Sequence, residues 1–380
     1  MEEYWQKKPL FVKGAIPAFT LDSALESPIS AQELIKLSQS PDVESRLVKA
    51  KPWRLEKGPF KSRGIPNLSA ADWTVLVQGM EAHHPAAETI LSWFRFIPDS
   101  RLDDLMISLA GPGGGVGPHL DSYDVFLIQM SGRRHWRISE QKDHEMVEGV
   151  PLKILANFKK EQEWVVEPGD LLYLPPKVAH DGIALDPGTQ TWSIGFRSPS
   201  WKELLQETLW RLADSLENEE TLSKLISDPE QKATNSPAIL PAGMVTKLEK
   251  ELDKLSLKGK RLTQLVSSSL GEVLSEPKPH IVFNPPNDPV EFDEFIELAQ
   301  QSGIKTSGKT RLILDSNTIY CNGEQISSKD DGEDSYAAWL VFANQRKLSA
   351  DQAIEYLEIQ EFADQIYEGY LDGWFELIAL

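Results

Sequence analysis

Gly117-Pro118-His119-Leu120-Asp121 is the stretch that decides the fold, together with His180, which follows 59 residues after Asp121. If residues 119–121 lie in a strand, the side chains of His119 and Asp121 share one face, because side chains alternate along a strand. His180 can then reach them from a neighbouring strand. Two imidazoles and one carboxylate on one side of a metal form the facial triad of non-heme Fe(II) oxygenases, which leaves positions open for a co-substrate and dioxygen. The pattern therefore predicts an iron site made by these three residues.

The residues before His180 indicate the scaffold of this site. Pro168-Gly169-Asp170 is a tight-turn signal, and residues 171–174 form a short apolar strand that ends at Pro175-Pro176, since proline cannot donate to a sheet. Other short β-rich runs recur at close spacing, with turn residues between them, at 76–78, 105–108, 125–128, 136–138, 164–166 and 192–196. Such spacing is typical of a barrel or sandwich. We predict an α+β chain built on a double-stranded β-helix, or cupin-like barrel, over residues 1–200.

The composition limits the classes of protein that the chain can belong to. Its 380 residues, 41% of them apolar, are enough for two or three domains with sizeable cores. The single cysteine, Cys321, excludes a disulfide framework and a cysteine-rich metal site. We find no signal peptide and no apolar run long enough to cross a membrane, so we expect a cytoplasmic protein without a membrane partner.

Residues 201–275 have a different pattern from the barrel. Leucine and valine recur at helical spacing in two seams, at residues 205, 209, 212 and 216 and at residues 245, 248, 252 and 255. A third helix is expected over 262–273. Three short helices without a sheet bury little surface by themselves. They must pack on the barrel or on a second copy of the chain, and we favour a helical dimerisation segment.

Residues 276–380 predict a third, acidic domain. A helical pattern over 291–299, a hairpin around Ser316-Asn317 and a helix capped by Ser349 suggest a winged-helix-like module. Residues 281–380 of this region carry 19 acidic and 6 basic side chains, within a net charge of −19 for the whole chain. Because phosphate neutralisation dominates nucleic-acid affinity, we expect no direct contact with nucleic acid. The charge suits a basic protein partner, or it serves solubility alone.

An iron oxygenase of this kind usually takes 2-oxoglutarate, whose far carboxylate needs a fixed cation. Arginine offers a planar bidentate fork for it. In the strand that follows Gly132, Arg134 and Trp136 share one face while Arg133 and His135 share the other. We expect Arg134 to face inward and bind the carboxylate, and Ser108 on an earlier strand to add a hydroxyl. The alternative is a surface arginine on a turn.

Two further motifs carry little chemistry. Residues 113–117, Gly-Gly-Gly-Val-Gly, lack the Lys-Ser/Thr pair of a phosphate loop and lead into a strand, so we expect a flexible lip beside the iron. The Gly-x-Ser-x-Gly sequence of acyl-transfer hydrolases is missing from the chain.

With these residues placed, the chain resembles the JmjC family of 2-oxoglutarate oxygenases, and within it the bacterial ribosomal oxygenases. The resemblance covers the first 200 residues densely, and in the rest it is one of domain order. The segments that carry it are 73–78, 94–98, 103–108, 112–121, 123–126, 132–134 and 193–197.

The resemblance implies a homodimer that uses Fe(II) and 2-oxoglutarate to hydroxylate an arginine side chain at its β-carbon, in large-subunit ribosomal protein sixteen. Tyr123, Asp124 and Asp181 lie near the metal ligands in sequence and could hold the substrate guanidinium. Two alternatives remain open at this point. One is a JmjC demethylase that oxidises an N-methyl group, and the other is a non-catalytic cupin-like chaperone for ribosomal proteins.

Overall fold

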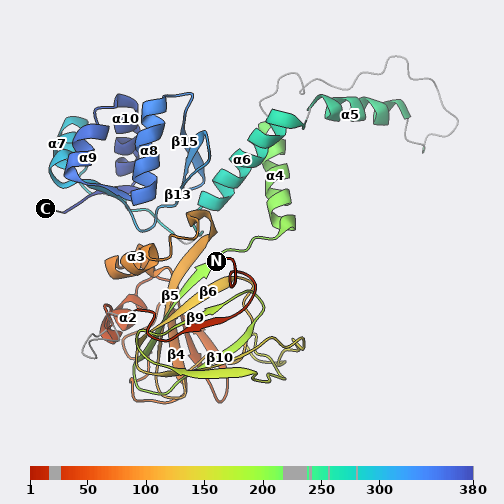
Figure 1. The fold of residues 1–380 in the computed structure, drawn as a ribbon, viewed down its shortest axis with the longest axis vertical. Helices are drawn as coiled ribbons and strands as arrows, with labels where there is room; N and C mark the ends of the chain where they lie inside the picture. Colours follow the sequence, from red (N-terminus) through yellow and green to blue (C-terminus); the bar gives the residue numbers. More distant parts are fainter. Residues whose placement is uncertain (17–26, 217–237, 239–241, 256, 280, 380) are drawn as a thin grey trace.

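The computed structural model describes residues 1–16, 27–216, 238, 242–255, 257–279 and 281–379. The N-terminal part forms a barrel of two facing sheets, with α3 between it and the C-terminal domain (Figure 1). Within the described residues the larger sheet has eight strands, in the spatial order β1 (Leu10–Val12), β9 (Leu171–Leu174), β6 (Asp124–Ser131), β11 (Thr189–Phe196), β5 (Leu102–Ala110), β4 (Trp73–Val77), β2 (Ser45–Lys49) and β3 (Arg54–Lys57).

The smaller barrel sheet positions the predicted site. It has the order β10 (Ala179–Ala184), β7 (Arg134–Ser139) and β8 (Gln162–Val166), and both of its pairings are antiparallel. His180 is paired with Ile138, and Ala184 with Arg134. Paired residues share a face, so His180, Trp136 and Arg134 all point to the buried side of this sheet. Double-stranded β-helices have this arrangement of two facing sheets, and the predicted fold class is confirmed.

Apolar side chains between the sheets explain why the barrel forms. One cluster fills the region under β4, β5 and β11 and includes Trp73, Ile107 and Trp192, each about 1% exposed or less. A second, smaller cluster lies between β6, β7 and β9. Two helices pack on the first cluster, α2 (Ala31–Leu37) and α3 (Pro85–Ser92). Helix α2 begins with a capping box, since the Ser30 hydroxyl accepts from the Glu33 N–H and the Glu33 carboxylate accepts from the Ser30 N–H.

The helical segment lies beyond the barrel and contains α4 (Trp201–Ser215), α5 (Ala242–Lys254) and α6 (Gly259–Ser275). Helices α4 and α6 pack on each other, and Arg211 of α4 forms an ion pair with Glu272 of α6 at 2.7 Å. Helix α5 extends away from the rest of the chain in Figure 1. The leucine seams are largely uncovered within this single chain: Leu205, Leu209, Leu248 and Leu252 are each more than half exposed.

The C-terminal domain is a winged helix, as predicted. Its helices are α7 (Phe292–Ser302), α8 (Glu333–Gln345), α9 (Ala350–Tyr356) and α10 (Gln360–Leu371). They enclose a core centred on Trp339, Phe342 and Phe362. Two small sheets complete the domain, one of β16 (Lys347–Leu348), β12 (Ile304–Thr306) and β17 (Phe375–Leu377), and one of β13 (Leu312–Leu314), β14 (Thr318–Cys321) and β15 (Glu324–Ser328).

Two single-turn 3-10 helices lie where the barrel meets this domain. They span Met80–Ala82 and Asp99–Arg101. Among the described residues, every helix is too short or too polar to cross a bilayer.

Candidate metal centre

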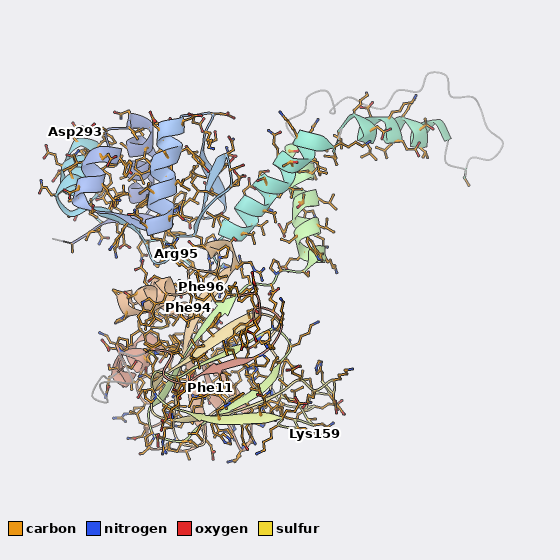
Figure 2. All side chains as sticks on the ribbon, in the orientation of Figure 1. Phe11, Phe94, Arg95, Phe96, Lys159 and Asp293 are labelled. Carbon is orange, nitrogen blue, oxygen red and sulfur yellow. The ribbon has the colours of Figure 1, made fainter. Side chains whose placement is uncertain are left out.

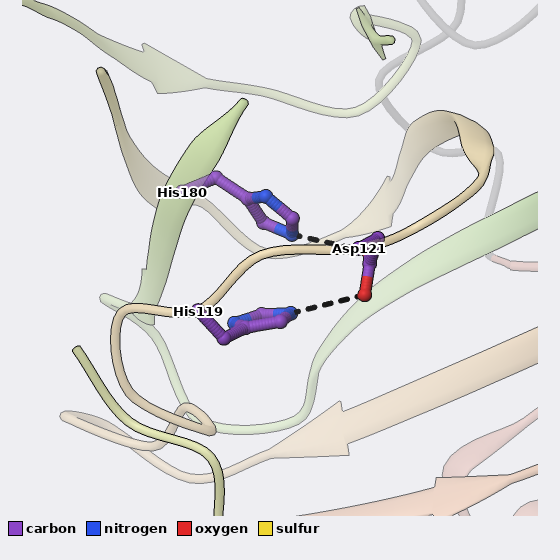
Figure 3. A group of neighbouring side chains, drawn as sticks. All are labelled: His119, Asp121 and His180. Atoms are coloured by element: carbon purple, nitrogen blue, oxygen red, sulfur yellow. Dashed lines mark ion pairs between the residues drawn. The ribbon is translucent and has the colours of Figure 1, made fainter. Parts of the chain in front are cut away.

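His119, Asp121 and His180 come together as the sequence predicted. One ligand atom from each lies within 4.8 Å of the other two (Figure 3). Nε2 of His180 is 3.4 Å from one carboxylate oxygen of Asp121, and Nε2 of His119 is 3.9 Å from the other. The donor set of two imidazoles and one carboxylate is that of the facial triad.

The backbone around His119 differs from the predicted strand. Residues 119–121 lie outside the named strands, and His119 forms an isolated antiparallel bridge with His180. The two residues exchange backbone hydrogen bonds of 2.9 Å in each direction, and the Asp121 carbonyl accepts from the Lys177 N–H at 2.8 Å. Local pairing with β10 therefore sets the positions of the ligands, in place of the regular alternation that we expected.

Backbone carbonyls orient both imidazoles. Nδ1 of His119 is 2.9 Å from the Gly117 carbonyl, and Nδ1 of His180 is 3.0 Å from the Val178 carbonyl. A carbonyl can only accept, so each Nδ1 must carry a proton and Nε2 is the ring atom that can bind a metal. Each ring therefore presents Nε2 as a ligand, and partners of this kind beyond the ligands are typical of metal-binding histidines.

The protonation of the ligands suits a divalent cation. Burial, helped by the nearby His180, lowers the pKa of His119 to about 4, so this imidazole is neutral at neutral pH. Burial alone would raise the pKa of Asp121, but its hydrogen bond to His180 and the charge of that imidazole hold it below its ordinary value. Burial alone would lower the pKa of His180, but the same contact with Asp121 raises it, so a bound cation would displace the proton on His180 Nε2. A carboxylate and a neutral imidazole are the forms that bind metal.

Arg134 lies on the same buried face and has no carboxylate partner among the described residues. Its side chain is 3% exposed. Nη1 donates to the Gly182 carbonyl at 3.1 Å, and Nη2 donates to the Ser108 hydroxyl at 3.4 Å. Nε is buried without an acceptor. Burial lowers the pKa of Arg134 to about 10, so the guanidinium is still charged at neutral pH.

These observations test whether iron and 2-oxoglutarate fit the residues present. The three ligand atoms match the donor set and leave one side of a metal open. A buried guanidinium with an unused donor lacks the anion that its burial calls for. A carboxylate of 2-oxoglutarate would supply that anion, so the site fits both groups.

Trp136 and Gly182 belong to the site but were not among the predicted site residues. The ring of Trp136 lies 5.8 Å from that of His180 and 5.8 Å from the Arg134 guanidinium, centre to centre. A Cβ at position 182 would come within 2.6 Å of the Trp136 ring, so only glycine fits there. The signal was available, since Gly182 follows His180 by two residues and must share its face.

The three predicted substrate residues lie in different surroundings. The Tyr123 hydroxyl hydrogen-bonds Asp121, and its side chain is near the metal ligands. The Asp124 carboxylate accepts from Tyr173 at 2.6 Å and from Gln6 at 2.9 Å. Asp181 points to the face opposite His180 and pairs with Arg137. Asp124 and Asp181 therefore have protein partners, and their role in binding substrate stays a prediction.

The glycine run at 113–117 is not the flexible lip that we expected. Gly113 N–H donates to the Ala184 carbonyl at 2.8 Å, and the Ala184 N–H donates to the Gly114 carbonyl at the same distance. A Cβ at Gly115 would lie 2.5 Å from the Gly182 carbonyl oxygen. The glycines serve close approach of the loop to β10, which fixes the chain just before His119.

Comparisons with known proteins agree with this geometry. Residues 89–204 match the model of the JmjC domain, and residues 255–376 match that of the ROXA-like winged helix. The chain is 34% identical over 345 residues to the ribosomal protein uL16 3-hydroxylase of Escherichia coli, covering 86% of this chain and 84% of that protein. The chain belongs to the JmjC-domain ribosomal oxygenases.

Other relatives support the assignment. A probable ribosomal oxygenase of Haemophilus influenzae is 35% identical over 212 residues, which is 54% of this chain and 50% of that protein. The solved structure of the E. coli ribosomal oxygenase YcfD in complex with cobalt and 2-oxoglutarate has a TM-score of 0.78. It is 31% identical and covers 99% of this chain and 96% of its own. The chain is thus a 2-oxoglutarate oxygenase, and its His-Asp-His cluster is the metal site.

Proposed function

We propose that this protein hydroxylates the β-carbon of an arginine side chain in ribosomal protein uL16. The observation that carries the proposal is the pairing of His119, Asp121 and His180 with a buried arginine, Arg134, that has no carboxylate partner among the described residues. The E. coli relative named for uL16 hydroxylation covers most of the chain and supports the choice of client. Iron and 2-oxoglutarate, when bound, would activate dioxygen, one atom of which enters the C–H bond while the other converts 2-oxoglutarate to succinate and carbon dioxide.

Each residue of the site has a distinct part in this proposal. His119 and His180 hold iron through Nε2, and Asp121 holds it through its carboxylate. Arg134 binds the far carboxylate of 2-oxoglutarate, and Ser108 orients Arg134. Trp136 covers the guanidinium on its buried side and keeps water from it. Since the chain's own groups only bind and orient, its share of catalysis is positioning and exclusion of water.

The arginine substrate would enter from the exposed side of the ligands. His119 and Asp121 are 24% and 20% exposed, whereas His180 is 3% exposed. Tyr123 lies beside Asp121 and has the clearest geometry for contact with a guanidinium. For Asp124 to bind the substrate, Gln6 must first leave its carboxylate, and for Asp181 to do so, Arg137 must leave.

The decisive experiment combines the full chain with Fe(II), 2-oxoglutarate and purified unmodified uL16. We expect a mass gain of one oxygen atom on an arginine-containing peptide of uL16, together with stoichiometric succinate. Fragment spectra that place the oxygen elsewhere would refute the β-carbon assignment. The Asp121→Ala protein is the matched control and should give neither product.

The same reaction separates the alternatives. Demethylation is the first alternative. It is supported by a relative from Aedes aegypti, the bifunctional lysine-specific demethylase and histidyl-hydroxylase NO66, which is 25% identical over 54% of this chain. Release of formaldehyde from a methylated peptide would favour that activity. Tight binding of uL16 with no succinate formed would favour the chaperone.

We also propose that the chain is a homodimer joined through its helical segment. Trp201 is 82% exposed, and the exposed leucines of α4 and α5 form continuous apolar seams. A patch of this kind rarely stays open to water on a monomer. Twofold symmetry is the commonest closed assembly and would cover both copies at once.

The proposal extends to the division of the chain and its location. We assign catalysis to residues 1–200, dimerisation to 201–275 and an acidic winged-helix domain to 276–380. A ribosomal client places the enzyme in the cytoplasm.

A further inference from the structure

A second cavity lies far from the metal ligands, between the barrel and the C-terminal domain. Its volume is about 400 Å³. Glu81, Leu91 and Arg95 line it from the barrel side, and Lys309, Arg311 and Arg346 line it from the C-terminal domain. Figure 2 labels Arg95 where the two parts of the chain meet. None of these residues takes part in the proposed reaction.

Two arginines cross this boundary in opposite directions. Arg95 donates through Nη2 to the Ala343 carbonyl at 2.9 Å and through Nη1 to the Asn344 carbonyl, at the end of α8. Arg311 donates through Nη1 to the Leu102 carbonyl at 2.8 Å and through Nη2 to the Asp103 carbonyl, at the start of β5. Each guanidinium thus binds the backbone of the other domain, and the cavity has fixed walls.

The cavity carries an excess of cations. Asp99 pairs with Arg95 at 2.6 Å. Within the described part of the chain, Lys309, Arg311 and Arg346 have no carboxylate oxygen within 4.0 Å, and their recorded bonds go to backbone carbonyls. Carbonyl dipoles satisfy donors without cancelling a full positive charge.

Arg346 has the clearest vacancy for an anion. Its Nη2 donates to the carbonyls of Ser307 and Thr310, at 3.3 and 2.9 Å, while Nε and Nη1 have no acceptor among the described residues. The side chain is only partly buried, so these donors are open to the cavity. Burial lowers the pKa of Arg346. The positive charges of Arg95 and Arg311 lower it further, while the negative charges of Asp99 and Glu88 raise it. A partly buried guanidinium beside like charges is stabilised by an anion.

Two carboxyl groups of the cavity do not cancel this charge. Glu81 accepts from the Leu105 N–H at 3.0 Å, and burial with the nearby Asp104 raises its pKa to about 7. This carboxyl is therefore about half protonated at neutral pH. Glu88 is the remaining acidic group of the lining, against four cations without a carboxylate partner among the described residues, Lys309, Arg311, Arg346 and Lys347.

We propose that this interdomain cavity binds a small organic anion, with phosphate or carboxylate oxygens on Arg346 and Lys309. Its apolar part would lie against Leu91, Leu274 and Ile281, which also line the cavity. The volume lies within the range of about 300–1,000 Å³ that is common for small-molecule sites. Because the lining combines cationic with apolar side chains, a purely hydrophobic ligand does not suit it.

The test is calorimetric titration of the full chain with inorganic phosphate, phenyl phosphate and benzoate. We expect saturable binding of at least one, with phenyl phosphate tighter than inorganic phosphate because its ring meets the apolar wall. Lys309→Met should weaken binding by about tenfold, the usual effect of one charge-assisted hydrogen bond. Arg346→Asn, which suits the left-handed backbone there (φ 60°), should weaken it further.

Arg54→Met is the matched control, since Arg54 is exposed on β3 at the edge of the barrel sheet. It should leave the affinity unchanged. Binding of benzoate alone would assign carboxylates as the ligand class, and binding of both phosphates alone would assign phosphate esters. The proposal is overturned if no probe saturates, if Arg54→Met weakens binding as much as Lys309→Met, or if 2-oxoglutarate displaces the probe one for one.

Discussion

The barrel and the C-terminal domain both enclose aromatic cores, but they differ in the buried groups that lack a partner. In the C-terminal domain these atoms are neutral, in the amide of Asn322 and the hydroxyls of Ser327 and Ser335. In the barrel they include the guanidinium Nε atoms of Arg46, Arg134 and Arg137. Arg137 has a carboxylate partner in Asp181, whereas Arg134 has none among the described residues and shares the face of His180. Leaving a charged group unpaired costs far more free energy than leaving a hydroxyl unpaired.

This difference links the buried unpaired guanidinium of Arg134 to the metal and co-substrate site of the barrel. Thr306 and Thr310 of the C-terminal domain donate to carbonyls of their own domain, and their hydrogen bonds hold the fold. Arg134, His119 and His180 instead present free donors or lone pairs toward a common face. The unpaired groups of the barrel therefore lower its stability, and a bound metal and co-substrate would offset this loss. The predictions below test this contrast.

The largest expected effect is on turnover when a metal ligand is lost. Asp121→Ala should abolish succinate formation, because even groups that only support ligands typically cost about 10–100-fold in affinity or activity when removed. The apolar clusters of the barrel are untouched, so circular dichroism should show a folded protein. Succinate at the wild-type rate would disprove the role of Asp121 as a ligand.

The next effect separates two neighbouring arginines. Arg134→Met should raise the apparent 2-oxoglutarate constant by about thirtyfold or more, since an unpaired desolvated charge costs about 2–5 kcal/mol. Arg133→Met is the matched control: Arg133 is half exposed and pairs with Asp186 at 2.9 Å on the other face. Steady-state kinetics with varied 2-oxoglutarate decides, and equal effects from the two would contradict the assignment.

These two predictions rest on features that could be inferred from the sequence. The residue types of the His-x-Asp motif and the inward face of Arg134 are visible in the chain itself, the second through the alternation of side chains along a strand. The bridge between His119 and His180 depends on a loop tethered by the glycine run and by Lys177, which no local pattern reveals. The Arg95 and Arg311 contacts join residues more than 200 positions apart, so they follow from the docking of two domains.

A third prediction concerns assembly, where the barrel and the helical segment should respond separately. Leu209→Glu combined with Leu252→Glu should convert a dimer to a monomer, because charges in a closed apolar interface lose their water. Light scattering should show the mass falling by half, while succinate formation with a peptide substrate persists. A wild-type mass of one chain at micromolar concentration would leave the seams without the proposed partner copy.

The smallest expected effect is a pH dependence of stability at the boundary between the domains. Burial and Asp104 raise the pKa of Glu81 from 4.5 to about 7, and Arg311 opposes them. The folded state therefore favours the protonated carboxyl, so this stabilisation is complete below pH 4.5 and is lost as the pH rises through 7.

Glu81→Gln keeps an acceptor for the Leu105 N–H but cannot ionise. Its melting temperature should match that of the wild type at pH 5 and exceed it by a few degrees at pH 8, for a linkage on the order of 1–3 kcal/mol. Glu88→Gln, at the same cavity, controls for the loss of an acidic group. If both variants shift the melting temperature equally at both pH values, the buried ionisation of Glu81 is not the cause.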